Sequence, residues 1–179
     1  MQFGTDKSSR GHGYLVRYHQ HLAYLRECEG VVVAEIGVWT GASVAMWGHW
    51  LPRAEVIGVD IDLSRVSVPR PINVRLIEAD AATLELPARS VDVLIDDGSH
   101  QAKHVTATLS RMWPAIRPGG WLIIEDWACQ WEAGYGGNTH GSPATKALHR
   151  WVDQALLPQC DDVAELHCYE ELAMIRKAP

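Results

Sequence analysis

The stretch Val31-Val32-Val33-Ala34-Glu35-Ile36-Gly37-Val38-Trp39-Thr40-Gly41 decides the fold of this 179-residue chain. Its first half is a short, continuous apolar run, which is typical of a strand buried on both faces within a parallel sheet. Its second half carries two glycines, and the following residues 42–51 have apolar side chains at helical spacing. The stretch therefore predicts a strand, a tight turn and a helix in succession.

The same alternation continues along the chain. Apolar runs over residues 56–61, 74–79, 91–95 and 121–124 predict four more strands, and Pro118-Gly119-Gly120 is expected to start the last of them. Helical spacing recurs over about 13–28, from Ala102 to Ile116 and from Leu148 to Leu156. Two closing segments, about 163–169 and 172–177, are separated by so few residues that they should pair as an antiparallel hairpin. Together the pattern predicts a doubly wound α/β fold, a mostly parallel seven-stranded sheet with helices on both faces.

Composition is that of an ordinary globular domain, with 47% apolar and 21% charged residues. The net charge of −6 argues against nucleic acid or an anionic membrane as partner. No apolar run approaches the roughly 20 residues that span a bilayer, and the first residues lack a signal-peptide pattern. The four cysteines, Cys28, Cys129, Cys160 and Cys168, show no disulfide or CxxC spacing. We expect a cytoplasmic single domain over 1–179, with an N-terminal helical cap at about 1–28.

Polar residues stand where the first three strands end, which is where ligands of such sheets bind. Glu35 closes the first strand, and in the glycine turn Trp39 stands where a dinucleotide fingerprint would have its middle glycine. Asp60 ends the second strand about 20 residues later, where a carboxylate can accept both hydroxyls of a ribose. Asp80 follows the third strand, within reach of a base's exocyclic amine. Each signal alone is weak, since Asp60 could equally be a strand-end cap, but jointly they describe a nucleoside site.

The fourth and fifth strands end in acidic pairs. Asp96-Asp97 leads into Gly98-Ser99-His100, and Glu125-Asp126 leads into Trp127. Adjacent parallel strands bring both pairs to one edge, where carboxylates without a Lys or Arg nearby repel one another unless a cation neutralises them or some stay protonated. A hard divalent cation, most plausibly Mg²⁺, resolves the conflict. The alternative is that these carboxylates point apart, capping helices and contacting solvent.

His100 lies within this acidic cluster. Its ordinary pKa of roughly 6.5 suits proton abstraction near neutral pH, and the alternative is a helix-start residue like His104. The long loop over about 127–143 carries His140 and aromatic residues that suit a ring-shaped acceptor. Of the eight tryptophans, Trp39, Trp127 and Trp131 are expected to face the site, although the last two could simply pack the loop on the sheet. Core packing is expected of Trp47, Trp50, Trp113, Trp121 and Trp151.

These motifs resemble those of class I S-adenosylmethionine (SAM)-dependent methyltransferases. More narrowly, they are similar to the metal-dependent sugar O-methyltransferases of macrolide and other antibiotic tailoring, including the rhamnosyl O-methyltransferase and cephalosporin-hydroxylase-like group. The motifs are Glu35–Gly41, Gly58-Val59-Asp60, Asp96–His100, Pro118-Gly119-Gly120 and Ile124-Glu125-Asp126, with Phe3-Gly4-Thr5-Asp6-Lys7, His12-Gly13-Tyr14 and Tyr135-Gly136-Gly137 as further matches. The resemblance covers nearly the whole chain and implies the Rossmann-like class I methyltransferase fold.

The resemblance also implies roles for individual residues. Mg²⁺ would be ligated by Asp97, Glu125 and Asp126, a spacing that also resembles the metal triad of catechol O-methyltransferases, and His100 would be the general base. The cofactor SAM would lie with its methionine end on Gly37 and its neighbours, its ribose on Asp60 and its adenine on Asp80. The residues expected to bind SAM are Glu35, Gly37, Trp39, Gly41, Asp60, Asp80 and Asp96. The implied reaction methylates a hydroxyl of a small molecule, a sugar or other diol of a glycosylated natural product.

Three other functions stay open at this stage. A nicotinamide-dependent reductase would need the GxGxxG turn, which is absent, and would not need the acidic cluster. A metal-independent methyltransferase would use His100 alone, and a non-catalytic module would bind SAM without turnover. Larger members of the group carry an additional N-terminal domain without a counterpart here, which leaves the substrate pocket and a homo-oligomer open. A substrate lid would come from Thr5-Asp6-Lys7, the 127–143 loop or a second subunit.

Overall fold

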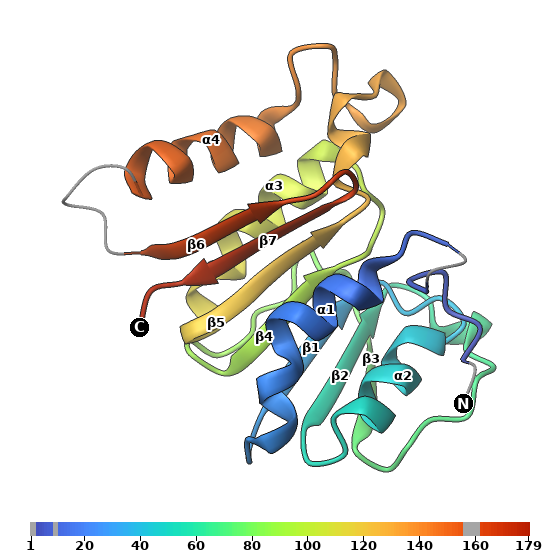
Figure 1. Ribbon diagram of the computed structural model, residues 1–179. Coiled ribbons are helices and arrows are strands. Elements are labelled where there is room, and N and C mark those ends of the chain that lie inside the picture. Colours follow the sequence, from blue (N-terminus) through green and yellow to red (C-terminus); the bar gives the residue numbers. More distant parts are fainter. Residues whose placement is uncertain (1–2, 9–10, 156–161) are drawn as a thin grey trace.

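A computed structural model describes residues 3–8, 11–155 and 162–179, with the backbone alone over 151–155. Its centre is a seven-stranded sheet in the order β3-β2-β1-β4-β5-β7-β6 (Figure 1). The strands are β1 (Val32–Ile36), β2 (Glu55–Asp60), β3 (Val74–Glu78), β4 (Val91–Asp96), β5 (Ile116–Glu125), β6 (Val163–Cys168) and β7 (Leu172–Lys177). Strands β1 to β5 pair in parallel, whereas β7 pairs antiparallel with both β5 and β6. The predicted sheet with its C-terminal antiparallel hairpin is confirmed.

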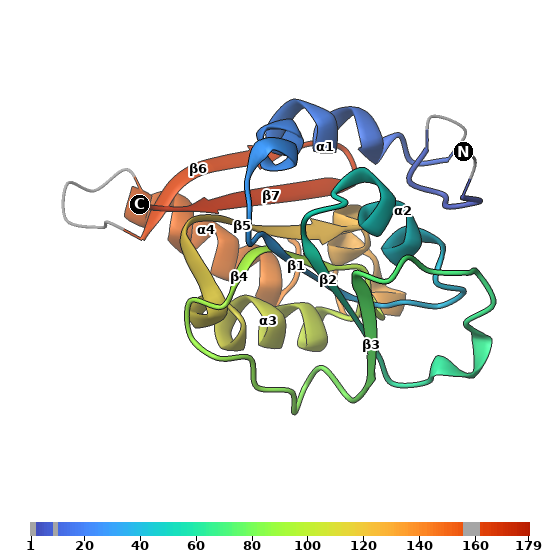
Figure 2. The same cartoon turned by 90° about the horizontal axis from the view of Figure 1, so that it is seen from below.

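Helices cover both faces of the sheet, as predicted. Figure 2 shows α1 (Tyr14–Leu22) and α2 (Ala42–Trp50) above it, and α3 (Ala102–Arg111) and α4 (Pro143–Ala155) on the other side. Five short 3₁₀ turns lie between these elements, at Ala23–Glu27, Leu63–Arg65, Trp113–Ala115, Trp127–Trp131 and Ala133–Tyr135. The helices predicted over 13–28 and 102–116 are therefore each an α-helix followed by such a turn.

Two hydrophobic cores follow from the alternation of side chains along buried strands. Val33 of β1 packs under α1 and α2 with the fully buried Trp47, whereas its neighbour Ala34 packs with Leu109 and Leu148 of α3 and α4. Of the tryptophans predicted for the core, Trp47 and Trp121 are buried, Trp50 and Trp113 are partly buried against it, and Trp151 lies outside the described side chains. Buried side chains therefore pack against both faces of the strands that carry the strand-end motifs.

The start of β5 differs from the prediction. The strand begins at Ile116, which pairs with Val91, whereas the next pair along β4 joins Val93 to Trp121. More residues of β5 than of β4 lie between these pairs, so Pro118-Gly119-Gly120 forms a bulge inside the strand and does not start it. Gly119 takes a φ of +75° there, a conformation that glycine adopts without steric cost.

None of the helices in the described part of the chain is long and apolar enough to cross a membrane. Cys28, Cys129 and Cys168 are free thiols, as predicted, and Cys160 lies outside the described residues. The N-terminal residues run along the carboxyl ends of the strands before α1 begins, which brings them beside the strand-end motifs (Figure 1).

Candidate active site

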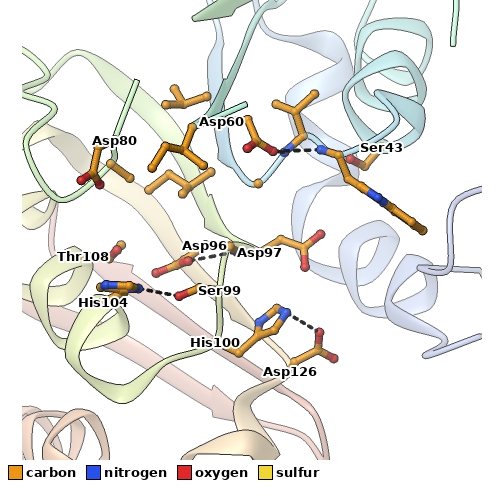
Figure 3. A pocket seen from close by; sticks show the side chains of 18 of the residues that line it. Ser43, Asp60, Asp80, Asp96, Asp97, Ser99, His100, His104, Thr108 and Asp126 are labelled. Carbon is orange, nitrogen blue, oxygen red and sulfur yellow. Dashed lines mark hydrogen bonds and ion pairs between the residues drawn. The ribbon is translucent and has the colours of Figure 1, made fainter. Parts of the chain in front are cut away.

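A cavity of about 570 Å³ opens at the carboxyl ends of the strands, where the sheet architecture predicts a ligand (Figure 3). We call one half of it the nucleoside end; it is lined by the β1–α2 turn (Gly37–Thr40), Asp60 and Asp80. The other half, the acidic end, is lined by Asp97, His100 and Asp126. Eight of the predicted site residues line the cavity: Gly37, Trp39, Asp60, Asp80, Asp96, Asp97, His100 and Asp126. Glu35, Gly41 and Glu125 do not.

Asp60 fixes the glycine turn at the nucleoside end. Its Oδ2 accepts hydrogen bonds from the backbone N–H groups of Val38, at 2.7 Å, and Trp39, at 3.0 Å. Partial burial acts to raise the pKa of Asp60, but these N–H donors outweigh it and the pKa lies below its ordinary value. Asp60 is therefore both a strand-end cap and part of the cavity wall. Asp80 likewise lines the cavity while its Oδ1 accepts from the Ala82 N–H at 2.8 Å.

Gly37 is where the two ends of the cavity touch. Its φ is +92°, and a Cβ placed there would lie 2.0 Å from the backbone oxygen of Asp97, a distance that no side chain tolerates. Gly41 has a φ of +87° at the start of α2 but does not line the cavity. Gly41 is therefore a turn residue beside the cavity wall, and its predicted contact with the cofactor stays a prediction.

Three residues of the cavity wall carry strained backbone. Trp39, His100 and Asp126 have φ values of +46°, +56° and +49°, in the left-handed region that non-glycine residues rarely adopt. Such conformations cost roughly 1–3 kcal/mol each and cluster at functional sites. Trp39 is also 63% exposed although it is a large aromatic residue. The strain supports the prediction that these residues form a site.

The acidic end contains a lysine that the sequence interpretation did not place there. The Lys7 ammonium is fully buried, and its Nζ lies 2.5 Å from Asp97 Oδ2, 2.6 Å from Glu125 Oε2 and 3.2 Å from Glu35 Oε1. The premise that no Lys or Arg lies near these carboxylates was therefore wrong. The signal was present in the Phe3–Lys7 motif, but only the tertiary fold brings that segment to the strand ends.

Burial and mutual repulsion shift the proton affinities of this cluster. Burial raises the pKa of Glu35 to about 7, with Lys7 opposing the rise. Burial also raises the pKa of Glu125 and of Asp97 above their ordinary values. Burial alone would lower the pKa of Lys7, but the three carboxylates raise it well above normal, so Lys7 stays protonated.

The predicted metal triad is divided between two groups of side chains. Ligand atoms lying within 4.8 Å of one another form one group of Asp97, His100 and Asp126, and another of Glu35, Asp97 and Glu125. Glu125 faces Lys7 and accepts a short hydrogen bond from the Tyr18 hydroxyl. Among the described residues, the expected set of Asp97, Glu125 and Asp126 is therefore not one group. Asp97 and Asp126, each 23% exposed, offer carboxylate oxygens to the cavity and fit a hard divalent cation.

His100 is held from two sides. Its Nε2 lies 3.3 Å from Asp126 Oδ2, and its backbone oxygen accepts a hydrogen bond from Gln130 Nε2 at 2.9 Å. Gln130 is buried, and its Oε1 accepts from the Ser142 hydroxyl at 2.8 Å. The 127–143 loop is thus anchored beneath His100. His104, by contrast, is paired with the Ser99 hydroxyl at 2.6 Å.

The aromatic residues of this loop do not face the cavity as expected. Trp127 is buried in the core and contacts Trp131 edge-on, with ring centroids 6.0 Å apart. Neither tryptophan lines the cavity, nor does His140. The alternative is confirmed for Trp127, which packs in the core with Ala144 and Leu148 of α4, whereas Trp131 is 43% exposed.

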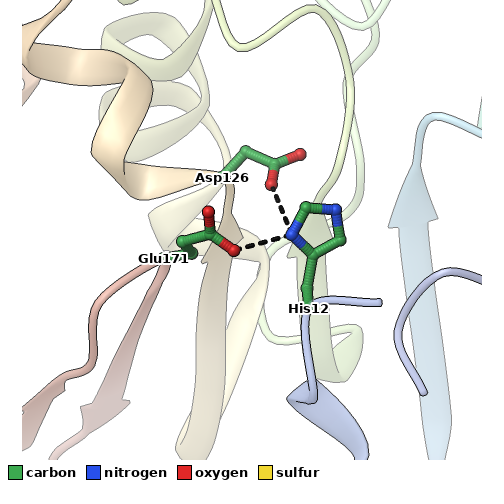
Figure 4. Close-up of side chains that lie close together, drawn as sticks. All are labelled: His12, Asp126 and Glu171. Atoms are coloured by element: carbon green, nitrogen blue, oxygen red, sulfur yellow. Dashed lines mark hydrogen bonds and ion pairs between the residues drawn. The ribbon is translucent and has the colours of Figure 1, made fainter. Parts of the chain in front are cut away.

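Asp126 is also held by residues distant in sequence. Its Oδ1 accepts a hydrogen bond from the Tyr14 hydroxyl at 2.9 Å. Figure 4 shows that His12 faces both Asp126 and Glu171, with its Nδ1 at 3.7 Å from Asp126 Oδ1 and 2.6 Å from Glu171 Oε2. The bond to Glu171 raises the pKa of His12. Sequence reasoning missed these supports, although His12 and Tyr14 belong to a motif it had noted.

A parallel sheet with one antiparallel strand inserted as β7, a glycine turn after β1 and a cavity across the strand ends define the class I methyltransferase fold. The chain belongs to the family described as a methyltransferase domain, whose model matches residues 34–127. The matched segment runs from β1 to the end of β5 and includes every predicted site residue.

Characterised relatives are enzymes of antibiotic pathways. The chain is 32% identical to the 8-demethyl-8-alpha-L-rhamnosyl tetracenomycin-C 2'-O-methyltransferase of Streptomyces olivaceus, over 99% of this chain and 53% of the relative. It is 36% identical to the mycinamicin VI 2''-O-methyltransferase of Micromonospora griseorubida, over 98% of this chain and 51% of that relative. A solved structure of the MycE methyltransferase with Mg, SAH and mycinamycin VI superposes with a TM-score of 0.82 at 29% identity, covering 98% of this chain and 51% of that one. The chain spans about half the length of these relatives.

Proposed function

We propose that this chain is a SAM- and Mg²⁺-dependent O-methyltransferase acting on a sugar hydroxyl of a glycosylated natural product. The observation that carries the proposal is one continuous cavity with a nucleoside end and an acidic end, whose walls bring His100 and two carboxylates beside the glycine turn. Relatives named as sugar O-methyltransferases, and a similar structure that contains Mg and SAH, support the same chemistry.

The nucleoside end suits SAM. The β1–α2 turn would receive the methionine end, Asp60 the ribose hydroxyls and Asp80 the adenine amine. Asp96 is buried at the cavity wall, and its Oδ2 has no hydrogen-bond partner among the described residues. A buried carboxylate oxygen without a donor is costly, so Asp96 would accept a hydrogen bond from the cofactor. The exposed side chain of Trp39, on the same cavity wall, would cover the bound SAM.

The acidic end suits the cation and the acceptor. Asp97 and Asp126 would hold Mg²⁺ through carboxylate oxygens, with water and the acceptor completing its shell. SAM would supply an electrophilic methyl group, and a cation held there would lower the pKa of the acceptor hydroxyl. A vicinal diol, as on a sugar, could chelate the cation at two points, which favours such an acceptor.

His100 would remove the proton from the acceptor hydroxyl while the methyl group passes from sulfur to that oxygen. One carbon–sulfur bond breaks, one carbon–oxygen bond forms, and the proton ends on His100. Asp126, 3.3 Å from His100 Nε2, stabilises the resulting imidazolium, and Gln130 keeps the residue in place. General-base help of this kind contributes about 10²–10⁴-fold to the rate.

The test is binding followed by turnover. Calorimetric titration with SAM, with and without Mg²⁺, should show binding to the wild-type chain, and Asp97→Ala should lose the effect of Mg²⁺ while retaining SAM. Absence of SAM binding would reject the cofactor. Incubation with SAM and a panel of glycosylated macrolides should yield a product with one added methyl group by mass spectrometry.

Two outcomes would favour the alternatives to this proposal. Turnover that persists in EDTA would replace it with the metal-independent mechanism, and SAM binding without turnover on any acceptor would favour the non-catalytic module. A homo-oligomer, a cytoplasmic location and the domain boundaries stay predictions from the sequence.

A further inference from the structure

Two tyrosines of α1 reach the acidic pair at the end of β5. Tyr14 and Tyr18 lie one helical turn apart, which places both on the same face of the helix. The Tyr14 hydroxyl donates a hydrogen bond to Asp126 Oδ1 at 2.9 Å, and the Tyr18 hydroxyl donates one to Glu125 Oε1. Both tyrosines are buried, so their hydroxyls are held between α1 and the sheet.

The Tyr14 hydroxyl holds Asp126 at two points. It has one proton to donate, and the charged carboxylate at 2.9 Å is a stronger acceptor than the backbone oxygen of Glu171 at 3.2 Å. With its proton on Asp126 Oδ1, the hydroxyl oxygen accepts a hydrogen bond from the Asp126 N–H at 3.2 Å. Asp126 needs such support because its φ of +49° is unfavourable for a residue other than glycine.

This contact also leaves the other carboxylate oxygen of Asp126 free for the cavity. While Oδ1 is bonded to Tyr14, Oδ2 lies 3.3 Å from His100 Nε2 on the cavity wall (Figure 3). The turn between β6 and β7 fixes the next residue, because the Glu171 backbone oxygen accepts from the Trp127 N–H at 3.0 Å. The backbone around Asp126 and one of its two carboxylate oxygens are thus held, and only Oδ2 faces His100.

We propose that Tyr14 is a positioning residue whose hydroxyl orients the Asp126 carboxylate, so that Oδ2 is presented to the cation and to His100. Packing accounts for the ring of Tyr14, which lies edge-on to Tyr18, but a phenylalanine would pack equally well. The hydroxyl needs a separate reason, and a hydrogen bond to a metal ligand both orients that ligand and tunes its affinity for the metal. That Asp126 holds a cation rests on the proposed function; that Tyr14 orients its carboxylate does not.

The first test compares crystal structures and requires no cation. Tyr14→Phe keeps the buried ring and removes only the hydroxyl. In this variant the Asp126 carboxylate should turn so that Oδ2 no longer faces His100. Tyr24→Phe alters a tyrosine that is 47% exposed in the turn after α1, and should leave Asp126 in place. An Asp126 carboxylate with the same orientation in Tyr14→Phe and in the wild type would overturn the proposal.

The second test measures the binding of Mn²⁺, a probe that stands in for Mg²⁺ and is visible by electron paramagnetic resonance. Tyr14→Phe should raise the Kd for Mn²⁺ by roughly tenfold or more, and Tyr24→Phe should leave it unchanged. In Tyr14→Phe kcat should fall, while the Kd and the KM for SAM stay the same. A merely structural role would lower the melting temperature without changing the Mn²⁺ affinity of the folded chain, and that result would overturn the proposal.

The two tests separate this inference from the proposed function. A wild type that binds no Mn²⁺ would contradict the proposed metal function. A turned Asp126 carboxylate in the Tyr14→Phe crystal structure would still support the positioning role, and an unturned one would still reject it.

Discussion

The two ends of the cavity are built in different ways. At the nucleoside end, the bond between Asp60 and the Val38 N–H joins residues 22 positions apart. At the acidic end, Lys7 reaches Asp97 across 90 positions and Glu125 across 118. The first end rests on the backbone of neighbouring strand–turn–helix units, and the second on side chains gathered from both termini of the domain. Local geometry thus forms one half of the site, and complete tertiary folding forms the other.

The largest expected effect is a loss of turnover at the acidic end without a loss of SAM binding at the nucleoside end. His100→Ala should lower kcat by about 10²–10⁴-fold because it removes the proposed base, while the Kd for SAM at the nucleoside end stays unchanged. His140→Ala, on an exposed part of the 127–143 loop, is the matched control and should keep normal turnover. Steady-state kinetics and calorimetry measure both. Normal turnover of His100→Ala would remove this residue from the mechanism.

The second prediction concerns Gly37, where the nucleoside end contacts the backbone of the acidic end. Gly37→Ala would place a Cβ 2.0 Å from the Asp97 backbone oxygen and force an unfavourable φ, so it should lower the free energy of unfolding by about 3 kcal/mol or more. Gly134→Ala, which has no atom within 4 Å of the added Cβ and no positive φ, should change it by less than about 0.5 kcal/mol. Urea denaturation compares them. Equal free energies of unfolding for Gly37→Ala and Gly134→Ala would mean that Gly37 does not lie in tight contact with the Asp97 backbone.

A smaller effect probes the support under His100. Gln130→Ala leaves the His100 carbonyl and the Ser142 hydroxyl without their partner, which should cost about 1–3 kcal/mol of stability. It should also lower kcat more than it changes the KM for SAM. Gln20→Ala, at an exposed position of α1, serves as control. A larger change in SAM affinity than in kcat would place Gln130 with the nucleoside end.

The smallest expected effect is a pH dependence at the nucleoside end. The pKa of Asp60 is lower in the folded chain than its unfolded value of about 3.9. The stabilisation of the folded state by the Asp60 carboxylate is therefore complete above its unfolded pKa, about pH 4, and is lost as the pH falls through the folded pKa. Asp60→Asn should be less stable than wild type at pH 7 by about 1 kcal/mol or less, because solvent screens the group. This difference should shrink below pH 4 in denaturation curves; a constant difference would argue against the charged bonds to the turn.

Features formed by local sequence could be predicted, whereas features formed by contacts between distant residues could not. All seven strands could be predicted: apolar runs report the burial of most of them, and the short connection between β6 and β7 indicates their hairpin. Asp60, Asp97 and His100 could be placed at the cavity because motifs at strand ends lie there by topology alone. The start of β5 was misplaced, since a bulge depends on the partner strand as well as on Pro118-Gly119-Gly120.

The second half of the site was harder to predict from local patterns. Lys7, Tyr18 and Gln130 carry no local pattern that tells which distant side chain they meet. The expectation that a metal ion ligates Glu125 stays a prediction, and it took no account of Lys7, whose charge comes from 118 positions away. The strained φ angles at Trp39, His100 and Asp126 were equally beyond sequence reasoning, since non-glycine residues seldom adopt them.

The position of β7 has a consequence for how the chain folds. This last strand lies between β5 and β6, and Leu172 to Ile175 are buried there. Until residues 172–177 have been synthesised, β5 is an edge strand with an unpaired row of apolar residues, the kind of edge that promotes aggregation. Folding must then close long-range pairings such as Trp121 with Arg176, which slows it. The apolar edge of β5 is therefore covered only after residues 172–177 have been synthesised, although they are distant from it in sequence.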